Sequence, residues 1–457
     1  MKRLLQSGLF SCALFIFSCK KNDPPLPDNT ISFQASSQGL SSDSSSATIK
    51  LTMSRASNTS IALTVALSST GAAYGTQYTT TPAATSGRLN LTIPAGSKDV
   101  SFVVSKVAGA FFSGTETVIF TLSNITSPVV AGQSDSLLLT FGSIVSAGSQ
   151  IQLEGKTMAS NYTNSVFVDF SNNSQSDVDR KSWNLGFYSG ANFRVVLNPG
   201  YQTTAAALSK TDITTVGLAD TASIMNLNHD INDPATKALV DNWNGHLDST
   251  AFGDISATAD ANKVFLVSWE GAKSPKSSWY KVRVTRSGDG YSVQYAKLGE
   301  ATIKMLAVAK NASYNFVFAS LEAGKTVGFE PAKTAWDIEW SYSTYNSGLG
   351  SPYWFQDFVL LNYAGGAQAA QVLTATVSYA NFAESNLSSV TWLSTRDAIG
   401  SSWRATTGSG IYRDRFYVVK DPRGNVYKLQ FVSMGVGSDG GERGRPIIQY
   451  ALVKKGQ

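Results

Sequence analysis

Histidine and cysteine are scarce in this sequence, with two of each among 457 residues. Zinc fingers and three-histidine zinc sites need more ligands than this, and a disulfide framework needs more cysteines, so all three are excluded. Charge is also sparse: 15% of the residues are charged, and the formal net charge of +5 includes no cluster of Lys and Arg. A nucleic-acid surface needs such a cluster, and we therefore expect no nucleic-acid partner.

Motifs of several large enzyme classes are missing as well. The sequence contains no glycine-rich phosphate loop after an expected strand, no nucleophile elbow and no HExxH motif. Asp337 and Glu339 lie two positions apart, so on a strand their carboxylates share a face about 7 Å apart, as a glycosidase pair could. A structural explanation fits these two residues better. They alternate with tryptophan and isoleucine, so they would form the polar face of a strand whose other face is apolar. We therefore expect that the protein is not an enzyme.

The residues that are abundant are those of β-structure. Ser, Thr, Val, Tyr and Trp are frequent, charged helix formers are few, and there are 38 glycines, 18 tyrosines and 9 tryptophans. This composition predicts an all-β protein and argues against helical bundles and coiled coils. The length predicts about three domains.

The first residues are typical of a targeting segment. A basic start, Met1–Arg3, precedes an apolar run, Leu4–Phe17, that is too short to span a membrane as a stable helix. Ile16–Cys19 resembles a bacterial lipobox, in which a small residue precedes the cleavage site and the following cysteine carries diacylglycerol. The resemblance implies a signal peptide over residues 1–18 and lipidation of Cys19. The alternative is an ordinary secretory segment that happens to contain a cysteine.

Residues 19–29 are predicted to form a stiff tether, because Pro24, Pro25 and Pro27 prevent regular structure. Lipid on Cys19 makes the membrane an expected partner. The start of the tether, Lys20–Asp23, is similar to that of surface lipoproteins of Bacteroidetes. We therefore expect an outer-membrane lipoprotein exposed at the cell surface, with the periplasmic face as the alternative.

Residues 30–146 alternate between apolar and polar positions in short runs separated by Gly, Ser and Asn. Period-two alternation of this kind predicts strands, and seven of them make a β-sandwich. The expected strands are Ile31–Gln34, Ala47–Met53, Ile61–Leu67, Leu89–Ile93, Val100–Ser105, Thr117–Leu122 and Leu137–Phe141.

Part of this domain resembles a Calx-beta module. The residues that carry the resemblance are Tyr78, Gly87–Ser97 and Gly114–Asn124. The sequence departs from the family where the family binds calcium: Thr76 and Gln77 replace its acidic pair, and Ala108–Ser113 replaces its acidic loop. Calcium needs several carboxylate oxygens, and only Glu116 remains nearby. We therefore expect a spacer domain that does not bind calcium.

The rest of the chain contains an internal repeat. Trp183–Tyr188 aligns with Trp336–Ser341, and each is preceded by an apolar strand, Val166–Phe170 in the first copy and Phe316–Phe318 in the second. Each is followed by an aromatic hairpin: Trp279–Val284 with Tyr291–Tyr295, and Val426–Phe431 with Ile447–Leu452. The repeat predicts two tandem domains over residues 147–301 and 302–457. Alternation places Trp183 and Trp336 on core faces of their strands.

Three segments of the second copy resemble the HmuY family of haem-binding lipoproteins of Bacteroidetes: Trp336–Gly348, Gly424–Ser433 and Ile447–Lys455. The first copy has weaker counterparts of the first two. The resemblance implies a mostly β fold that takes haem from host haemoproteins at the cell surface and passes it to an outer-membrane receptor. Some members hold the iron between two histidines, whereas others use methionine or no obvious ligand.

Both histidines, His229 and His246, lie in the region that supplies the axial ligands in that family. Asp233–Gly245 predicts a helix of about ten residues, roughly 15 Å long, between them. That length suits an iron held between two imidazoles. Alternatives are ligation by one histidine with Met225 or a tyrosine, or a purely structural histidine such as His246 just past the end of a helix.

The second copy has no histidine, and between Met305 and Met434 it has no methionine. Any porphyrin there would have to use aromatic or tyrosine side chains. The candidates are Trp354, Phe355, Trp392, Trp403, Tyr345, Tyr353 and Tyr363.

The sequence therefore favours a haem-binding or tetrapyrrole-binding surface lipoprotein that captures its ligand for an outer-membrane receptor. The alternative is a non-catalytic adhesion protein that binds glycan or protein. An exposed aromatic platform of Trp354, Trp392 and Trp403 would favour that alternative. A third interpretation is a scaffold without a cofactor.

Overall fold

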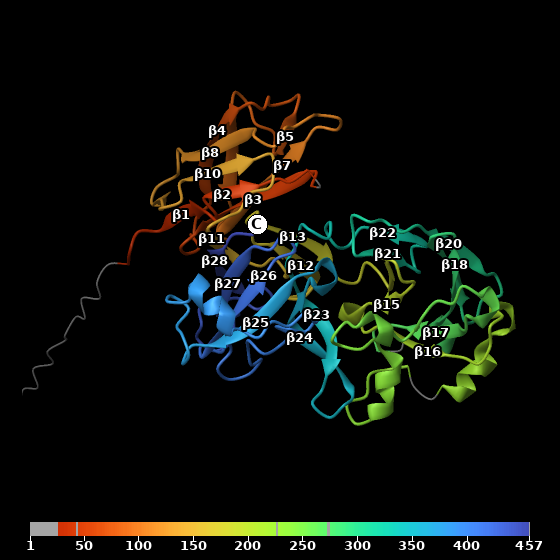
Figure 1. Ribbon diagram of the computed structural model, residues 1–457. Helices are drawn as coiled ribbons and strands as arrows, with labels where there is room; N and C mark the ends of the chain where they lie inside the picture. Colours follow the sequence, from red (N-terminus) through yellow and green to blue (C-terminus); the bar gives the residue numbers. More distant parts are fainter. Residues whose placement is uncertain (1–25, 43, 225–226, 272–274, 457) are drawn as a thin grey trace, which may run out of the picture.

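The computed structural model describes residues 26–42, 44–224, 227–271 and 275–456. These residues form β-strands and short 3-10 helices, and no α-helix occurs among them, which confirms the all-β class. Figure 1 shows an N-terminal sandwich lying against a larger body of two lobes, one mainly green and one mainly blue. The predicted signal peptide, residues 1–18, and the predicted lipidation site, Cys19, lie outside the described residues.

The sandwich is built from two five-stranded sheets, with the orders β5-β7-β3-β1-β9 and β2-β10-β8-β4-β6. Its strands are β1 (Thr30–Phe33), β2 (Ser37–Gly39), β3 (Ser46–Met53), β4 (Ile61–Thr70), β5 (Tyr78–Thr81), β6 (Arg88–Ile93), β7 (Asp99–Lys106), β8 (Thr117–Ser123), β9 (Val130–Ala131) and β10 (Ser136–Thr140).

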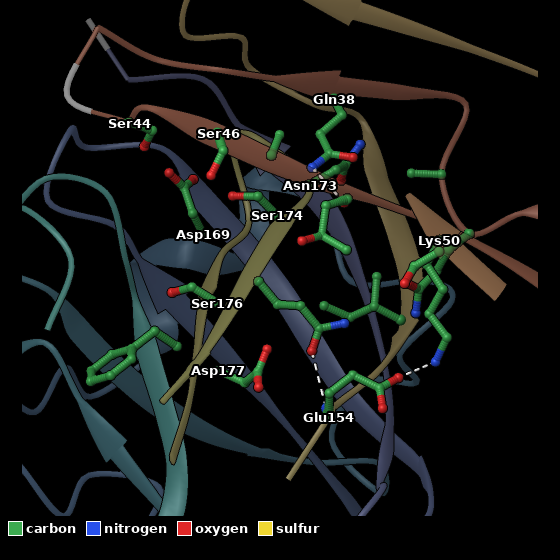
Figure 2. A pocket seen from close by; sticks show the side chains of 18 of the residues that line it. Gln38, Ser44, Ser46, Lys50, Glu154, Asp169, Asn173, Ser174, Ser176 and Asp177 are labelled. Carbon is green, nitrogen blue, oxygen red and sulfur yellow. Dashed lines mark hydrogen bonds and ion pairs between the residues drawn. The ribbon is translucent and has the colours of Figure 1, made fainter. Parts of the chain in front are cut away.

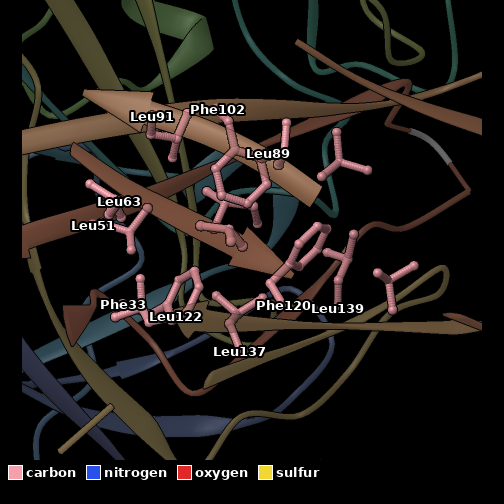
Figure 3. Packing of buried hydrophobic residues seen from close by; sticks show 14 of the residues in the cluster. Phe33, Leu51, Leu63, Leu89, Leu91, Phe102, Phe120, Leu122, Leu137 and Leu139 are labelled. Atoms are coloured by element: carbon pink, nitrogen blue, oxygen red, sulfur yellow. The ribbon is translucent and has the colours of Figure 1, made fainter. Parts of the chain in front are cut away.

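All seven strands expected from the sequence are present, and their alternating apolar residues form one core between the sheets. In β3, for example, Ala47 and Ile49 are buried, whereas Thr48 between them points outward. Figure 3 shows the aromatic centre of this core, where the rings of Phe102 and Phe120 lie 5.0 Å apart. Strands β2, β5 and β9 were not expected, because each is short and β2 and β5 are mostly polar.

The end of the expected tether is part of the sandwich. Asn29 is 6% exposed, and its Oδ1 accepts hydrogen bonds from Ser54 Oγ (2.9 Å) and the N–H of Arg55 (3.0 Å). The tether therefore ends before Asn29, and the predicted boundary at residue 29 is corrected by about one residue.

We expect calcium to leave the melting temperature of the protein unchanged. The Glu116 carboxylate already accepts hydrogen bonds from Ser113 and Gly114, which hold its pKa down to about 2. No group of three or more metal-ligating side chains lies among the described residues. The check is a thermal melt in excess CaCl2 and in EGTA, where a calcium-dependent rise of several degrees would contradict the expectation.

The two-lobed body contains four further sheets. Their strands are β11 (Gly148–Gln152), β12 (Asn164–Asp169), β13 (Ser174–Asp179), β14 (Leu185–Tyr188), β15 (Val195–Leu197), β16 (Thr204–Ala207), β17 (Val264–Ser268), β18 (Tyr280–Ser287), β19 (Gly290–Lys297), β20 (Lys304–Val308), β21 (Phe316–Ser320), β22 (Lys325–Val327), β23 (Ile338–Asn346), β24 (Pro352–Leu361), β25 (Gln368–Leu373), β26 (Arg415–Lys420), β27 (Val426–Ser433) and β28 (Ile447–Lys454).

Short 3-10 helices occur in the connections. They are η1 (Pro199–Tyr201), η2 (Ile213–Thr215), η3 (Leu218–Ser223), η4 (Pro234–Leu239), η5 (Leu247–Ser249), η6 (Ala259–Ala261), η7 (Lys276–Ser278), η8 (Tyr363–Gly365) and η9 (Glu384–Ser389). None of the helices in the described ranges is long and apolar enough to cross a membrane.

The internal repeat is visible in the order of the sheets. The first lobe has the sheets β16-β17-β18-β19-β20 and β15-β14-β21-β22, and the second lobe has β25-β26-β27-β28-β11 and β24-β23-β12-β13. In chain order, β11–β19 therefore corresponds to β20–β28. The first three strands of each copy complete the sheets of the other copy: β12 pairs with β23, β14 with β21, and β11 with β28.

Equivalent hydrogen bonds support this correspondence. Asn198 donates through Nδ2 to the carbonyl of Trp183 (2.9 Å), and Asn362 donates in the same way to the carbonyl of Trp336 (2.7 Å). Each side chain also accepts a hydrogen bond from the N–H of a glycine in the following 3-10 helix. The two copies therefore use the same asparagine hydrogen bonds in the turns that follow β15 and β24.

The predicted division at residues 301 and 302 does not separate two domains in this structure. It falls in the connection between β19 and β20, and each half of the chain supplies strands to sheets of the other half. The sequence repeat locates corresponding strands, but pairing between the copies joins them into one body. The expected aromatic hairpins, β18 with β19 and β27 with β28, are confirmed.

Candidate functional site

The loop that carries both histidines, residues 227–246, comes from the first copy and lies on the hairpin β23–β24 of the second. At its start, His229 Nε2 lies 3.5 Å from Thr344 Oγ1, and the carbonyl of Ile231 accepts a hydrogen bond from Ser351 Oγ (2.6 Å). Further along, the ring of Trp243 lies 6.3 Å from that of Tyr345. The hairpin is therefore the surface against which the loop is placed.

His229 is held in its neutral form. Burial lowers the pKa of its imidazole to about 4, and its Nδ1 has no hydrogen-bond partner among the described residues. A contact of 3.5 Å to Thr344 is at the limit of a hydrogen bond. A neutral imidazole with an unused nitrogen is the form in which histidine ligates a metal.

His246 is placed differently. Its side chain is exposed, and it precedes η5. The residue before it, Gly245, is buried against Tyr363 and Arg396. The two histidines therefore lie at the two ends of the loop, against different residues of the second copy. Met225, the third candidate ligand, lies outside the described residues.

The prediction of a helix of about ten residues between the histidines is wrong in both its length and its type. Asp233 does cap a helix, accepting a hydrogen bond from the N–H of Ala235, and Pro234 does begin it. It is a 3-10 helix that ends at Leu239, because Asp241 turns inward and accepts hydrogen bonds from the N–H groups of Leu197 (2.6 Å) and Ala251 (2.8 Å). The distance of about 15 Å between the two histidines was inferred from a longer helix, so this inference is wrong as well.

The tryptophans considered for an exposed platform lie in separate places. Trp403 is 1% exposed and stacks on Phe431, with 4.0 Å between ring centroids. Trp354 is half-buried and stacks on Tyr342 at 4.1 Å, and Trp392 packs on the small core around Phe416. These three residues form no common platform.

Aromatic side chains do gather on the β23–β24 hairpin. The rings of Tyr345, Tyr353, Phe355 and Phe358 contact one another at centroid distances between 5.0 and 6.3 Å. At the tip of the hairpin, Leu349 is 66% exposed and Tyr353 47% exposed, and Ile231 of the histidine loop is 39% exposed. An apolar edge therefore lies beside the loop of His229.

Two buried glutamate side chains lie between the two lobes, at a place that was not expected from the sequence. Glu330 and Glu339 line a cavity of about 70 Å³ together with Trp183, Trp336 and Arg396. Burial raises the pKa of Glu330 to about 8 and that of Glu339 to about 7. Glu339 was expected on the polar face of its strand, but both faces of β23 are buried, so this interpretation is corrected for Glu339 and for Asp337, which is 2% exposed.

We expect the unfolding free energy to fall between pH 6.5 and pH 8 because of Glu330. Its folded-state pKa is raised, so the folded protein holds a proton that the unfolded chain has lost, and raising the pH removes stability by up to about 1.4 kcal/mol per pH unit. His229 acts in the opposite direction, but only below pH 6.5. Glu330→Gln keeps an Oε1 acceptor for the N–H of Phe316 and should reduce the slope in urea unfolding, leaving the part that comes from Glu339. An equal slope in the variant would contradict this.

The chain is an all-β protein whose candidate site lies on a loop between two interlocked halves. Comparison with known families then identifies the family to which the chain belongs. The family model described as HmuY protein matches residues 161–450, which is more than half of the chain. The chain therefore belongs to the HmuY family, a family of haem-binding surface proteins. A single match spans both copies of the repeat.

No curated protein sequence matches this chain. Among solved structures, the apo form of the Calx CBD1 domain aligns with a TM-score of 0.21 and 14% identity, over 25% of this chain and 96% of that domain. CBD12 from CALX1.2 aligns with a TM-score of 0.21 and 11% identity, over 33% of this chain and 75% of the other. The E. coli chaperone DraB aligns with a TM-score of 0.17 and 10% identity, over 36% and 88%.

Proposed function

We propose that this protein binds haem, or a related tetrapyrrole, through His229 and the apolar edge of the β23–β24 hairpin. The observation that carries the proposal is the neutral imidazole of His229, whose Nδ1 has no partner in the described structure. Family membership supports haem as the ligand class. Haem supplies an iron that takes an axial nitrogen, and the exposed Leu349 and Tyr353 suit its apolar faces.

Binding requires the histidine loop to move from the hairpin. The cavity beside Thr344 and Arg396 is about 10 Å³, which is far too small for a porphyrin. The long contact between His229 and Thr344 is a weak restraint on this movement. His246, on the exposed end of the same loop, is the candidate for the second axial position.

The remaining parts of the proposal concern location and partners. The signal peptide would direct export, and lipid on Cys19 would anchor the protein to the outer membrane at the cell surface, in a bacterium of the Bacteroidetes. An outer-membrane receptor would then take the haem. We propose that both copies of the repeat descend from one HmuY-like unit, with the first copy keeping the histidines and the second supplying the hairpin. The protein acts by capture and delivery, without catalysis.

The test is a titration of the chain that follows Cys19 with ferric haem, observed by absorption. We expect a saturable Soret band with low-spin features at one haem per chain. A spectrum that stays like that of free haem would reject the proposal, and a glycan array would then test the adhesion alternative.

A further inference from the structure

A large polar cavity lies between the sandwich and the second lobe, away from the histidine loop. Its volume is about 560 Å³, which is within the range of small-molecule sites. Strand β3 of the sandwich forms one wall, and β13 with the segment around Glu154 forms the other (Figure 2). We propose that this cavity is a binding site for a neutral, polyhydroxylated ligand of the size of a mono- or disaccharide.

The two parts of the chain hold the cavity in a fixed shape. In the turn between β12 and β13, Asn173 donates through Nδ2 to the carbonyl of Ser37 (2.8 Å), and its Oδ1 accepts from Ser146 Oγ (2.6 Å). Elsewhere, Lys50 of β3 forms an ion pair with Glu154, and Arg445 forms one with Glu154 at 3.1 Å. These contacts join the sandwich to the second lobe, so the walls are in place before a ligand arrives.

The basic side chains of the cavity are already paired, which argues against an anionic ligand. Lys50 and Arg445 are paired with Glu154 and lie close to Asp99. Asp169 accepts hydrogen bonds from Ser171 Oγ and from the N–H and Nδ2 of Asn172. No described group of three or more metal-ligating side chains offers a cation site. An anionic ligand would therefore meet no unpaired cation among the described lining residues.

Unused hydroxyl groups face the cavity from both walls. They have no hydrogen-bond partner among the described residues, and each can donate and accept. They belong to Ser46, Thr48, Ser101, Ser174 and Ser176. Figure 2 shows Ser46 on the β3 side and Ser174, Ser176 and Asp177 on the β13 side.

A polyol matches this lining better than water alone or an apolar molecule. It offers closely spaced groups that donate and accept, as the unpaired hydroxyls do. Asp177 adds a carboxylate that uses one oxygen for Asn164 Nδ2 (2.7 Å), which leaves an acceptor for a ligand hydroxyl. Burial and the neighbouring Glu154 raise the pKa of Asp177, as expected for a carboxyl group in a partly enclosed site.

The test is isothermal titration of the chain that follows Cys19 with glucose, galactose, N-acetylglucosamine, maltose and lactose, with citrate as an anionic probe. We expect at least one sugar to bind saturably at one per chain. Ser46→Trp and Ser176→Trp fill the cavity from opposite walls and should weaken that binding at least tenfold. Thr92→Trp, on the exposed face of β6, is the matched control and should bind as the unchanged chain does.

Three results would overturn the proposal. They are saturable binding by none of the sugars, tighter binding of citrate than of any sugar, and sugar binding in both cavity-filling variants that equals that of the unchanged chain. Should both variants fail to fold, crystals of the unchanged chain soaked with the best sugar decide: density between β3 and β13 supports the site, and density elsewhere overturns it. Haem binding should be unchanged in both folded variants, so this inference and the haem proposal can fail independently.

Discussion

Asn362→Ala is expected to lower the unfolding free energy by about 3–5 kcal/mol, because it leaves several buried polar groups without partners. Asn362 is fully buried. Its Nδ2 donates to the carbonyls of Lys333 (2.8 Å) and Trp336 (2.7 Å), and its Oδ1 accepts from Asn315 Nδ2 (2.9 Å) and the N–H of Gly365 (3.0 Å). Urea unfolding followed by tryptophan fluorescence measures the loss.

The internal repeat supplies the comparison for this variant. Asn198 occupies the corresponding place in the first copy, and Asn198→Ala should cost a similar amount. Asn58→Ala, at an exposed asparagine without side-chain hydrogen bonds in the described structure, should change stability by less than about 0.5 kcal/mol. A loss below about 1 kcal/mol at both Asn362 and Asn198 would show that these turns do not depend on the asparagines.

His229→Ala is expected to weaken haem binding at least tenfold, or about 1.4 kcal/mol, and to remove the low-spin features of the bound spectrum. The imidazole is neutral over the whole physiological pH range, so no proton competes with iron for its nitrogen. Haem titrations at pH 7.5 of the unchanged chain, His229→Ala and His246→Ala make the measurement.

The outcome at His246 separates two ways of binding. An equal loss in His246→Ala indicates ligation by both histidines, and an unchanged affinity indicates His229 with another ligand. Unchanged spectra in both variants would refute coordination by this pair. Thermal melts of the apo proteins show whether either substitution acts through folding, as a cavity at the largely buried His229 could.

The strands of the sandwich could be predicted because each carries a simple alternation of apolar and polar residues. Leu89 and Leu91 point into the core and Asn90 between them points outward, so period two is visible in the letters. Strand β9, only Val130–Ala131, is too short for any period to show. Its pairing with β1 depends on neighbours that lie far away in the sequence.

The exchange of strands between the two copies could not be predicted from the sequence either, because it also depends on pairing between segments that lie far apart in the chain. The repeat showed that Val166–Phe170 and Phe316–Phe318 correspond, but alternation says nothing about which tryptophan strand each will pair with. The buried acids were missed because polar residues in an alternating strand are expected to face water. Glu339 lies on a strand that is covered on both faces, where alternation does not indicate exposure.

At the candidate site, the sequence indicated which loop carries the histidines and where its helix begins. It did not indicate where that helix ends or how the loop runs afterwards. Asp233 and Pro234 begin a helix as expected, whereas Asp241 ends it by bonding to distant backbone groups. Side-chain hydrogen bonds of this kind compete with helix formation and depend on the tertiary fold. The contact of the loop with the β23–β24 hairpin of the other copy follows from the same exchange of strands.

The most direct measurement is the absorption spectrum of the chain that follows Cys19 during titration with ferric haem, with His229→Ala titrated in parallel. Saturation at one haem per chain, with a low-spin Soret band that is lost in His229→Ala, is the predicted result. A spectrum of free haem at every ratio, or an identical bound spectrum in the variant, would contradict the assignment of His229 as the haem ligand.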